Sequence, residues 1–174
     1  LNFEVSPVWP LTVRVTDASG LFDAAAVTIN LTNVNESPTV LPATFRVAEN
    51  STAGTLTGAV IASDVDAGDV LSYAITAGNS GGAFTVDSIS GQLVVANPGL
   101  IDFETASVWT LTVSVTDAGG LPDSATITVI LTDINEAPTI LPVTLGLTEN
   151  PATGTVVGSV SANDVDAGDV LNYA

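Results

Sequence analysis

The sequence contains no cysteine, histidine or methionine, and its 174 residues include only two basic side chains, Arg14 and Arg46. Without cysteine and histidine the chain can form no disulfide, no thiolate-bound zinc or iron–sulfur cluster, and no histidine-based acid–base pair. No stretch approaches the ~18 consecutive apolar residues of a membrane-spanning helix, and no basic segment precedes an apolar one. We therefore expect no membrane insertion by this chain.

Positive charge is scarce, whereas negative charge is abundant. Nineteen acidic residues against two arginines give a formal net charge of −17. Disordered acidic chains combine such a charge with few apolar residues, but 46% of this chain is hydrophobic, so we expect it to fold. Repulsion from phosphates argues against nucleic-acid binding. The carboxylates require cations that the two arginines cannot supply.

A repeat with a period of 100 residues organises the chain. Phe3-Glu4 recurs as Phe103-Glu104, and Asp64-Val65-Asp66-Ala67-Gly68-Asp69 recurs without change from Asp164 to Asp169. This register divides the chain into the C-terminal part of one repeat (1–38), one whole repeat (39–138) and the N-terminal part of a third (139–174). We call the stretch at 33–38 the first junction and the stretch at 133–138 the second junction.

Apolar and polar residues alternate with a period of about two, which is typical of β-strands. Trp109, Leu111, Val113 and Val115 share one face of such a run, and a second inward row runs from Ala125 to Leu131. Further runs lie near 44–48, 55–62, 70–77, 83–87 and 92–96, separated by turns rich in Gly, Asn, Asp and Pro. The pattern predicts an all-β fold of tandem, seven-stranded, antiparallel Greek-key sandwiches.

Trp9 and Trp109 begin the strongest alternating rows. We predict that these indoles fill the core of the sandwich. A sugar-stacking platform is the alternative, and nothing in the sequence favours it.

The acidic residues concentrate in loops and at strand ends, so they should gather at the two poles of each sandwich. Carboxylates held that closely cannot all remain ionised without a cation. A site with oxygen donors alone suits Ca²⁺ better than zinc or copper. A solvated acidic surface is the alternative, but it explains poorly why the same loop positions recur in register.

Five motifs, in their order along the chain, resemble those of cadherin repeats, most closely the cadherin-like repeats of large bacterial surface adhesins. They are Glu49 in Ala48-Glu49-Asn50, the Asp64 and Asp66 pair, Ile101-Asp102-Phe103-Glu104, the strand end Val113 to Gly119, and Asp133-Ile134-Asn135-Glu136-Ala137-Pro138.

The resemblance implies Ca²⁺ at each junction. At the first junction it implies Asn2, Glu4, Asn33, Asn35, Glu36, Asp64, Asp66 and Asp117 as ligands. At the second junction it implies Glu49, Asp102, Glu104, Asp133, Asn135, Glu136, Asp164 and Asp166. Asp69 and Asp169 are further donors that the motif does not assign. The linker is one residue shorter than the usual family form, and the number of ions per junction stays open.

The resulting hypothesis is a non-enzymatic, calcium-binding adhesive module of an extracellular, bacterial surface protein. Its partners would be the adjacent repeats, which calcium would hold rigidly in line. A calcium-dependent polysaccharide-binding module and a homophilic adhesion module are the alternatives. A glycosidase using Asp102 and Glu104 as a carboxylate pair is disfavoured, because a small sandwich with its acids in loops offers no cleft.

Residues 1–38 and 139–174 carry about two and three strands respectively, too few to close a core. We expect the chain to continue in both directions. Strand donation between neighbouring molecules is the alternative.

Overall fold

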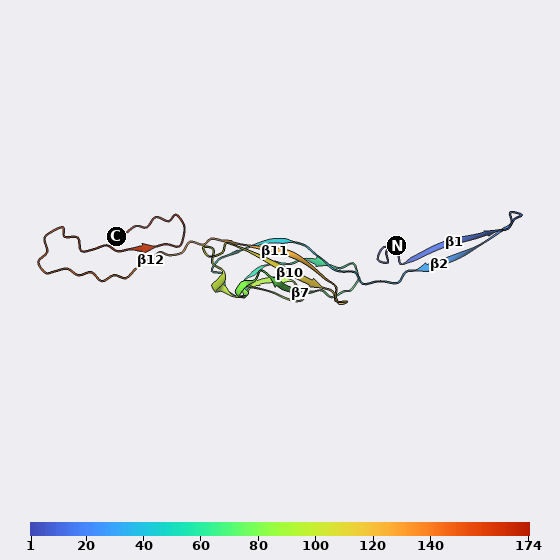
Figure 1. Cartoon of the computed structure of the whole chain (residues 1–174), viewed down its shortest axis with the longest axis horizontal. Coiled ribbons are helices and arrows are strands. Elements are labelled where there is room, and N and C mark those ends of the chain that lie inside the picture. The colour runs from blue at the N-terminus through green and yellow to red at the C-terminus, as the bar shows by residue number, and fades with distance from the viewer.

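The structure is a computed structural model that describes all residues from 1 to 174. Its segments lie along one line: a hairpin near the N-terminus, a central sandwich, and an extended C-terminal segment (Figure 1). The hairpin consists of β1 (Val8–Thr16) and β2 (Phe22–Asn30), which pair antiparallel. The C-terminal segment contains β12 (Thr139–Ile140) and β13 (Ala162–Asn163).

The central sandwich has two main sheets. One contains β4 (Ala43–Ala48), β11 (Pro122–Thr132), β10 (Val108–Thr116) and β7 (Ser72–Ala77), in that order. The other contains β5 (Leu56–Ala59), β9 (Gln92–Val95) and β8 (Phe84–Val86). The two-residue strands β3 (Thr39–Val40) and β6 (Ala62–Ser63) pair separately. Short 3₁₀ turns lie at Ser80–Gly82 and Pro98–Leu100, and neither is long or apolar enough to cross a membrane.

The sandwich confirms the predicted all-β fold, and its strands coincide with the seven predicted runs, apart from the added β3. The run at 55–62 divides into β5 and β6. One strand pair departs from the antiparallel prediction, because β4 runs parallel to β11, with Ala43 opposite Ile127. Strand direction depends on how the chain crosses between sheets, and residue alternation carries no information about it.

The core confirms the predicted inward rows. Leu111, Val113 and Val115 on β10 and Ile127 and Val129 on β11 have no exposed surface. The hydroxyl-bearing residues between them lie on the opposite face, as the pleat of a strand requires. Trp109 packs against this core with its ring edge-on to Phe84, at a centroid distance of 5.7 Å. The indole of Trp109 is therefore a core side chain and not a sugar platform. The same prediction is wrong for Trp9, which is 39% exposed because the β1–β2 hairpin has no second sheet to pack against.

The terminal segments do not form cores of their own. Every residue of β1 and β2 is exposed. Residues 139–174 form only two short strands, fewer than the three expected. In the central repeat β4 pairs with β11, and β5 pairs with β9. The segments 143–148 and 155–159 correspond to β4 and β5 in the 100-residue register, but residues 139–174 contain no counterpart of β11 or β9 for them to pair with. Within 139–174 only β12 and β13 pair.

Candidate metal centres at the two junctions

The loop that follows β6 presents three carboxylates toward the first junction. The backbone N–H of Asp66 donates to Asp64 Oδ1 at 2.9 Å, and the N–H of Asp69 donates to the Asp66 carbonyl at 3.3 Å. Gly68 closes this turn with a φ of 96°, a conformation that L-residues rarely adopt. As a result, carboxylate oxygens of Asp64, Asp66 and Asp69 lie within 4.8 Å of one another.

The linker of the first junction lies directly against this loop. Asn33 Nδ2 donates to Asp66 Oδ1 at 2.6 Å, and the N–H of Glu36 donates to Asp66 Oδ2 at 2.9 Å. Carboxylate oxygens of Glu4, Glu36 and Asp66 form a second group within 4.8 Å. Oxygen atoms from 1–38 and from the central repeat therefore meet around one buried side chain, Asp66.

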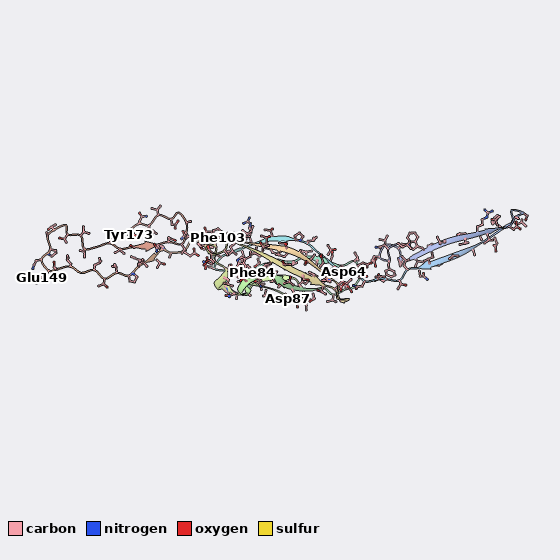
Figure 2. All side chains as sticks on the ribbon, in the orientation of Figure 1. Asp64, Phe84, Asp87, Phe103, Glu149 and Tyr173 are labelled. Carbon is pink, nitrogen blue, oxygen red and sulfur yellow. The ribbon has the colours of Figure 1, made fainter.

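Asn35 connects the same linker to the end of β10. Its Nδ2 donates to Asp117 Oδ2 at 2.7 Å, and the other oxygen of Asp117 accepts the Leu121 N–H at 2.7 Å. Asp117 is buried. Figure 2 shows that Asp64 lies at the end of the sandwich that faces the N-terminal hairpin.

The second junction lies at the opposite end of the sandwich, where Figure 2 labels Phe103. Glu49 is only 3% exposed, and its carboxylate accepts the N–H groups of Phe103 at 2.8 Å and Ile134 at 2.7 Å. This carboxylate therefore ties the end of β4 to the 101–104 stretch and to the linker. Carboxylate oxygens of Glu49, Glu104, Asp133 and Glu136 lie within 4.8 Å of one another.

The next repeat contributes oxygen atoms to this junction in the same way. The N–H of Glu136 donates to Asp166 Oδ2 at 2.7 Å, which repeats the contact between Glu36 and Asp66. Asp164, Asp166 and Asp169 form a further group within 4.8 Å. At each junction one group of carboxylates comes from the loop after the linker and another includes the linker glutamate, but only at the first junction does a loop carboxylate, Asp66, belong to the linker group.

Loss of hydration and mutual repulsion raise the pKa of several of these carboxyls. The pKa of Asp133 is raised by loss of hydration and then by the charges of Asp166 and Glu49. Loss of hydration also raises the pKa of Glu36, Asp69, Glu104 and Glu136, with neighbouring carboxylates adding to the effect. The pKa of Asp66 is lowered instead, by hydrogen bonds from the Glu36 N–H and from Asn33.

No basic side chain neutralises these groups. Arg14 lies over the Phe22 ring at 3.6 Å, and Arg46 is an exposed residue of β4 opposite Ile130. Three carboxylate oxygens are buried without any hydrogen-bond donor: Asp64 Oδ2, Asp69 Oδ2 and Glu136 Oε2. Oxygen-only donor sets with unpaired, desolvated carboxylates fit a hard divalent cation such as Ca²⁺.

The structure does not bring every predicted ligand into a carboxylate group. Asp102 and Asn2 each accept a backbone N–H three residues later, from Thr105 and Val5, and so cap their own turns. Asn135 donates to the Glu136 carbonyl at 2.9 Å, as Asn35 does to the Glu36 carbonyl at 3.3 Å. The other predicted acidic ligands at the second junction all lie in the two groups described above.

One residue at the second junction was missed by the sequence analysis. Asn50 donates from Nδ2 to Glu136 Oε1, linking the start of the repeat to its own C-terminal linker. Asn50 has a φ of 55°, and Asn150 has the same left-handed conformation with a φ of 61°. The recurrence of Glu49-Asn50 as Glu149-Asn150 was the signal that could have revealed it.

Comparison with known proteins places this architecture in a family. The family model for the cadherin domain matches residues 43–132. Human Protocadherin Fat 4 is 32% identical over 179 residues, an alignment that covers 96% of this chain and 4% of that protein. Mouse Cadherin-24 is 34% identical over 168 residues, covering 85% of this chain and 21% of that protein.

Solved structures agree with this assignment. The structure titled "Protocadherin gammaB7 EC3-6 cis-dimer structure" superposes with a TM-score of 0.71 and 27% identity, and covers 97% of this chain and 45% of that one. "Protocadherin Gamma B2 extracellular cadherin domains 3-6" superposes with a TM-score of 0.69 and 26% identity. Both alignments span this chain almost completely, so the agreement includes the order of its segments.

The chain spans a small part of the two relatives named above, 4% and 21% of their lengths. These relatives are human and mouse proteins, so they do not support the bacterial source that the sequence analysis favoured. Cadherin repeats are non-enzymatic modules of adhesion proteins, which excludes the glycosidase alternative. The matched domain model and the matching architecture together show that this chain belongs to the cadherin family.

Proposed function

We propose that this chain is a calcium-binding, adhesive module of an extracellular protein, in which Ca²⁺ at the two junctions holds successive repeats in line. One observation carries the proposal. At each junction, the backbone N–H of the linker glutamate, Glu36 or Glu136, donates to an aspartate of the next repeat, Asp66 or Asp166. Groups of carboxylates surround both contacts, and no basic side chain is present to neutralise them. Such an arrangement repels itself unless a cation is shared between the two repeats.

The chain's own residues define what a bound cation would hold together. Glu4 and Glu36 from the upstream side, with Asp66 from the downstream side, would be the ligands at the first junction. Glu49, Glu104, Asp133 and Glu136 would be the ligands at the second junction, with Asp166 fixing the linker through the Glu136 N–H. Bound calcium would supply positive charge and a wide coordination shell that accepts donors from different loops.

The mechanical consequence follows from the linkers. Each linker ends in a proline, Pro38 or Pro138, and continues into a strand of only two residues. Few backbone hydrogen bonds therefore cross either junction, and the carboxylates oppose close approach. Extracellular Ca²⁺ modules bind at ~10⁻⁴–10⁻³ M, so the millimolar calcium outside cells would suffice to stiffen the chain.

We propose repeat boundaries at 38/39 and 138/139, as the 100-residue register predicts. Homophilic contact and adjacent repeats are the proposed partners, whereas no specific observation favours polysaccharide, because Trp109 packs on Phe84. The bacterial source stays a prediction from the sequence motifs.

Small-angle X-ray scattering of the whole chain, in calcium and in chelator, tests the proposed function. We expect calcium to increase the maximum dimension and to narrow the distribution of shapes. The matched variants are Asp133→Ala, which should remove most of this effect, and Asp23→Ala, which should retain it because Asp23 lies in β2, outside every carboxylate group. Identical scattering curves in calcium and chelator for the unmodified chain would overturn the proposal.

A further inference from the structure

We propose that Asn50 is a site of N-linked glycosylation, which places an oligosaccharide beside the second junction. The inference goes beyond the proposed function and takes from it only the extracellular location. Three stretches match the acceptor sequence Asn-x-Ser/Thr in which x is not proline: Asn30-Leu31-Thr32, Asn35-Glu36-Ser37 and Asn50-Ser51-Thr52. Such short matches also arise by chance, but the structure distinguishes the three asparagines.

Attachment of a sugar uses one of the two N–H groups of the asparagine side-chain amide. The nitrogen Nδ2 bonds to the anomeric carbon of an oligosaccharide that is carried on a lipid diphosphate. The bond from that carbon to the diphosphate oxygen breaks, the lipid diphosphate leaves, and Nδ2 loses one proton. The folded chain therefore accepts a sugar without losing a contact only where one amide N–H has no partner and the side chain is exposed.

Asn50 meets both conditions. It is exposed and lies in the turn between β4 and β5, with the exposed Thr52 two residues later. Its φ of 55° is left-handed, a conformation that asparagine tolerates, and its backbone N–H donates to the Ile101 carbonyl at 2.9 Å. Its Nδ2 makes a single hydrogen bond, to Glu136 Oε1. The second amide N–H is free, so a sugar in its place leaves the contact with Glu136 intact.

Asn35 has no free amide N–H. Its Nδ2 donates to Asp117 Oδ2 at 2.7 Å and to the Glu36 carbonyl at 3.3 Å. The backbone of Gly119 lies against the same side chain, because a methyl group added at Gly119 would lie 2.7 Å from three atoms of Asn35. A sugar on Asn35 would therefore break one of the two hydrogen bonds in a crowded place.

Asn30 is less suited for a different reason. It ends β2 and corresponds to Ile130 in the 100-residue register. In the central sandwich Ile130 is half-buried between Val108 of β10 and Arg46 of β4. A sugar on Asn30 would crowd the side chains of the neighbouring strands in a complete repeat.

The turn that carries Asn50 recurs in the third repeat without the acceptor sequence. Asn150 has a φ of 61°, close to that of Asn50. However, Pro151 follows it directly, and Ala152 stands where the central repeat has Thr52. Either difference removes the acceptor sequence. The modification would therefore distinguish the central repeat from the repeat that follows it.

Glycopeptide mass spectrometry of the whole chain, secreted from cultured animal cells behind a cleavable signal sequence, tests the inference. We expect an oligosaccharide on Asn50 in most molecules and none on Asn35. Thr52→Ala should abolish the modification although it keeps the Asn50 amide, and Thr52→Ser should retain it. Thr32→Ala with Ser37→Ala removes the other two acceptor sequences and should leave the sugar on Asn50. An unmodified Asn50 would overturn the inference.

Access to the sugar in the folded chain supplies an independent readout. An endoglycosidase should release the oligosaccharide from the native chain in calcium as completely as from the denatured chain, because Asn50 is exposed. Release that requires denaturation would show an enclosed sugar, and it would contradict the free N–H assigned to Asn50.

The outcomes separate this inference from the proposed function. A sugar on Asn50 in a chain whose scattering does not respond to calcium would support the modification and overturn the calcium junction. A calcium response in a chain with an unmodified Asn50 would do the reverse. We expect both the sugar and the response, because the remaining amide N–H of Asn50 keeps its hydrogen bond to Glu136.

Discussion

Asn33 donates a hydrogen bond from Nδ2 to Asp66 Oδ1 at 2.6 Å across the first junction. At the second junction the corresponding residue is Asp133, whose carboxylate cannot donate to Asp166. Loss of hydration, and then the charge of Asp166, raise the pKa of Asp133. The two junctions therefore differ: a side-chain amide bridges the repeats at the first, whereas at the second an aspartate takes the place of that amide.

Calcium should bind the second junction before the first, because Asp133 supplies a charge that Asn33 lacks. Trp9 follows Glu4 by five residues and Trp109 follows Glu104 by five, so each indole reports on one junction. In a fluorescence titration, the Trp9→Phe chain, in which only Trp109 remains, should show tighter calcium binding than the Trp109→Phe chain. Exchanging the residues with Asn33→Asp and Asp133→Asn should reverse the order, each shifting affinity by on the order of tenfold. Unchanged order after the exchange would contradict this assignment.

In chelator the first junction should stay better aligned than the second, because the Asn33 amide bridges it. The chain has no native cysteine, so pairs of spin labels can be placed at will. Labels at Ala26→Cys with Thr126→Cys should give a narrower distance distribution than labels at Thr126→Cys with Ser159→Cys. Adding Asn33→Ala should broaden the first distribution in chelator but have little effect in calcium. Equal widths at both junctions in chelator would count against the amide bridge.

Glu49→Gln should destabilise the central repeat even without calcium. The Glu49 carboxylate accepts the N–H groups of Phe103 and Ile134 while almost fully buried, and a glutamine amide can accept only one of them. Hydrogen bonds to charged groups contribute about 1.5–3 kcal/mol each, so a loss of about 2 kcal/mol is expected in urea denaturation with chelator. Glu104→Gln is the control, because Glu104 is exposed and should lose calcium affinity but little stability.

The calcium-free junction should become less stable as pH rises. Asp133 has a raised pKa in the folded chain, so its folded form favours the proton. That contribution is fully present below the ordinary aspartate pKa and is lost as pH rises through the raised value. In chelator, the Asp133→Asn chain should therefore melt at a higher temperature than the unmodified chain, and this difference should grow as the pH rises from about 4 to 7. A gain that does not grow with pH would contradict the repulsion.

Asp87 should show the opposite pH dependence and serves as the comparison. Hydrogen bonds from the Ser90 N–H and hydroxyl, and then from the Ile89 N–H, lower the pKa of Asp87. The stability it contributes is therefore present above the ordinary pKa and is lost as pH falls through the lowered value. Asp87→Asn should melt lower than the unmodified chain at neutral pH, and this difference should shrink in acid.

Gly78→Ala should destabilise the sandwich far more than Gly120→Ala. Both glycines have a positive φ, 79° and 90° respectively, so alanine is strained at either position. A methyl group at Gly78 would also overlap the Thr110 carbonyl, whereas nothing lies within 4 Å of one at Gly120. We expect about 1 kcal/mol of lost stability at Gly120 and at least twice that at Gly78, by chemical denaturation. Equal losses would show that only the backbone angle matters.

Most of the fold could be predicted from residue periodicity. The rows from Leu111 to Val115 and from Ala125 to Leu131 are buried as expected, because a strand pleat sends alternate side chains to opposite faces. The parallel pairing of β4 with β11 could not be predicted in this way. Strand formation in 143–148 was overestimated for a related reason, since the alternating pattern is present but the partner strand is not.

The sequence alone determined the composition of the junctions: oxygen donors only, recurring with a period of 100 residues, next to linkers that end in proline. Only the tertiary structure decided how these donors are grouped. Asp66 is shared between two groups, Asp102 caps its own turn, and Glu49 is committed to two backbone N–H groups. The physical reason is that a carboxylate's role depends on which donors and charges lie within a few ångströms, and packing brings together residues as distant in sequence as Glu49 and Ile134.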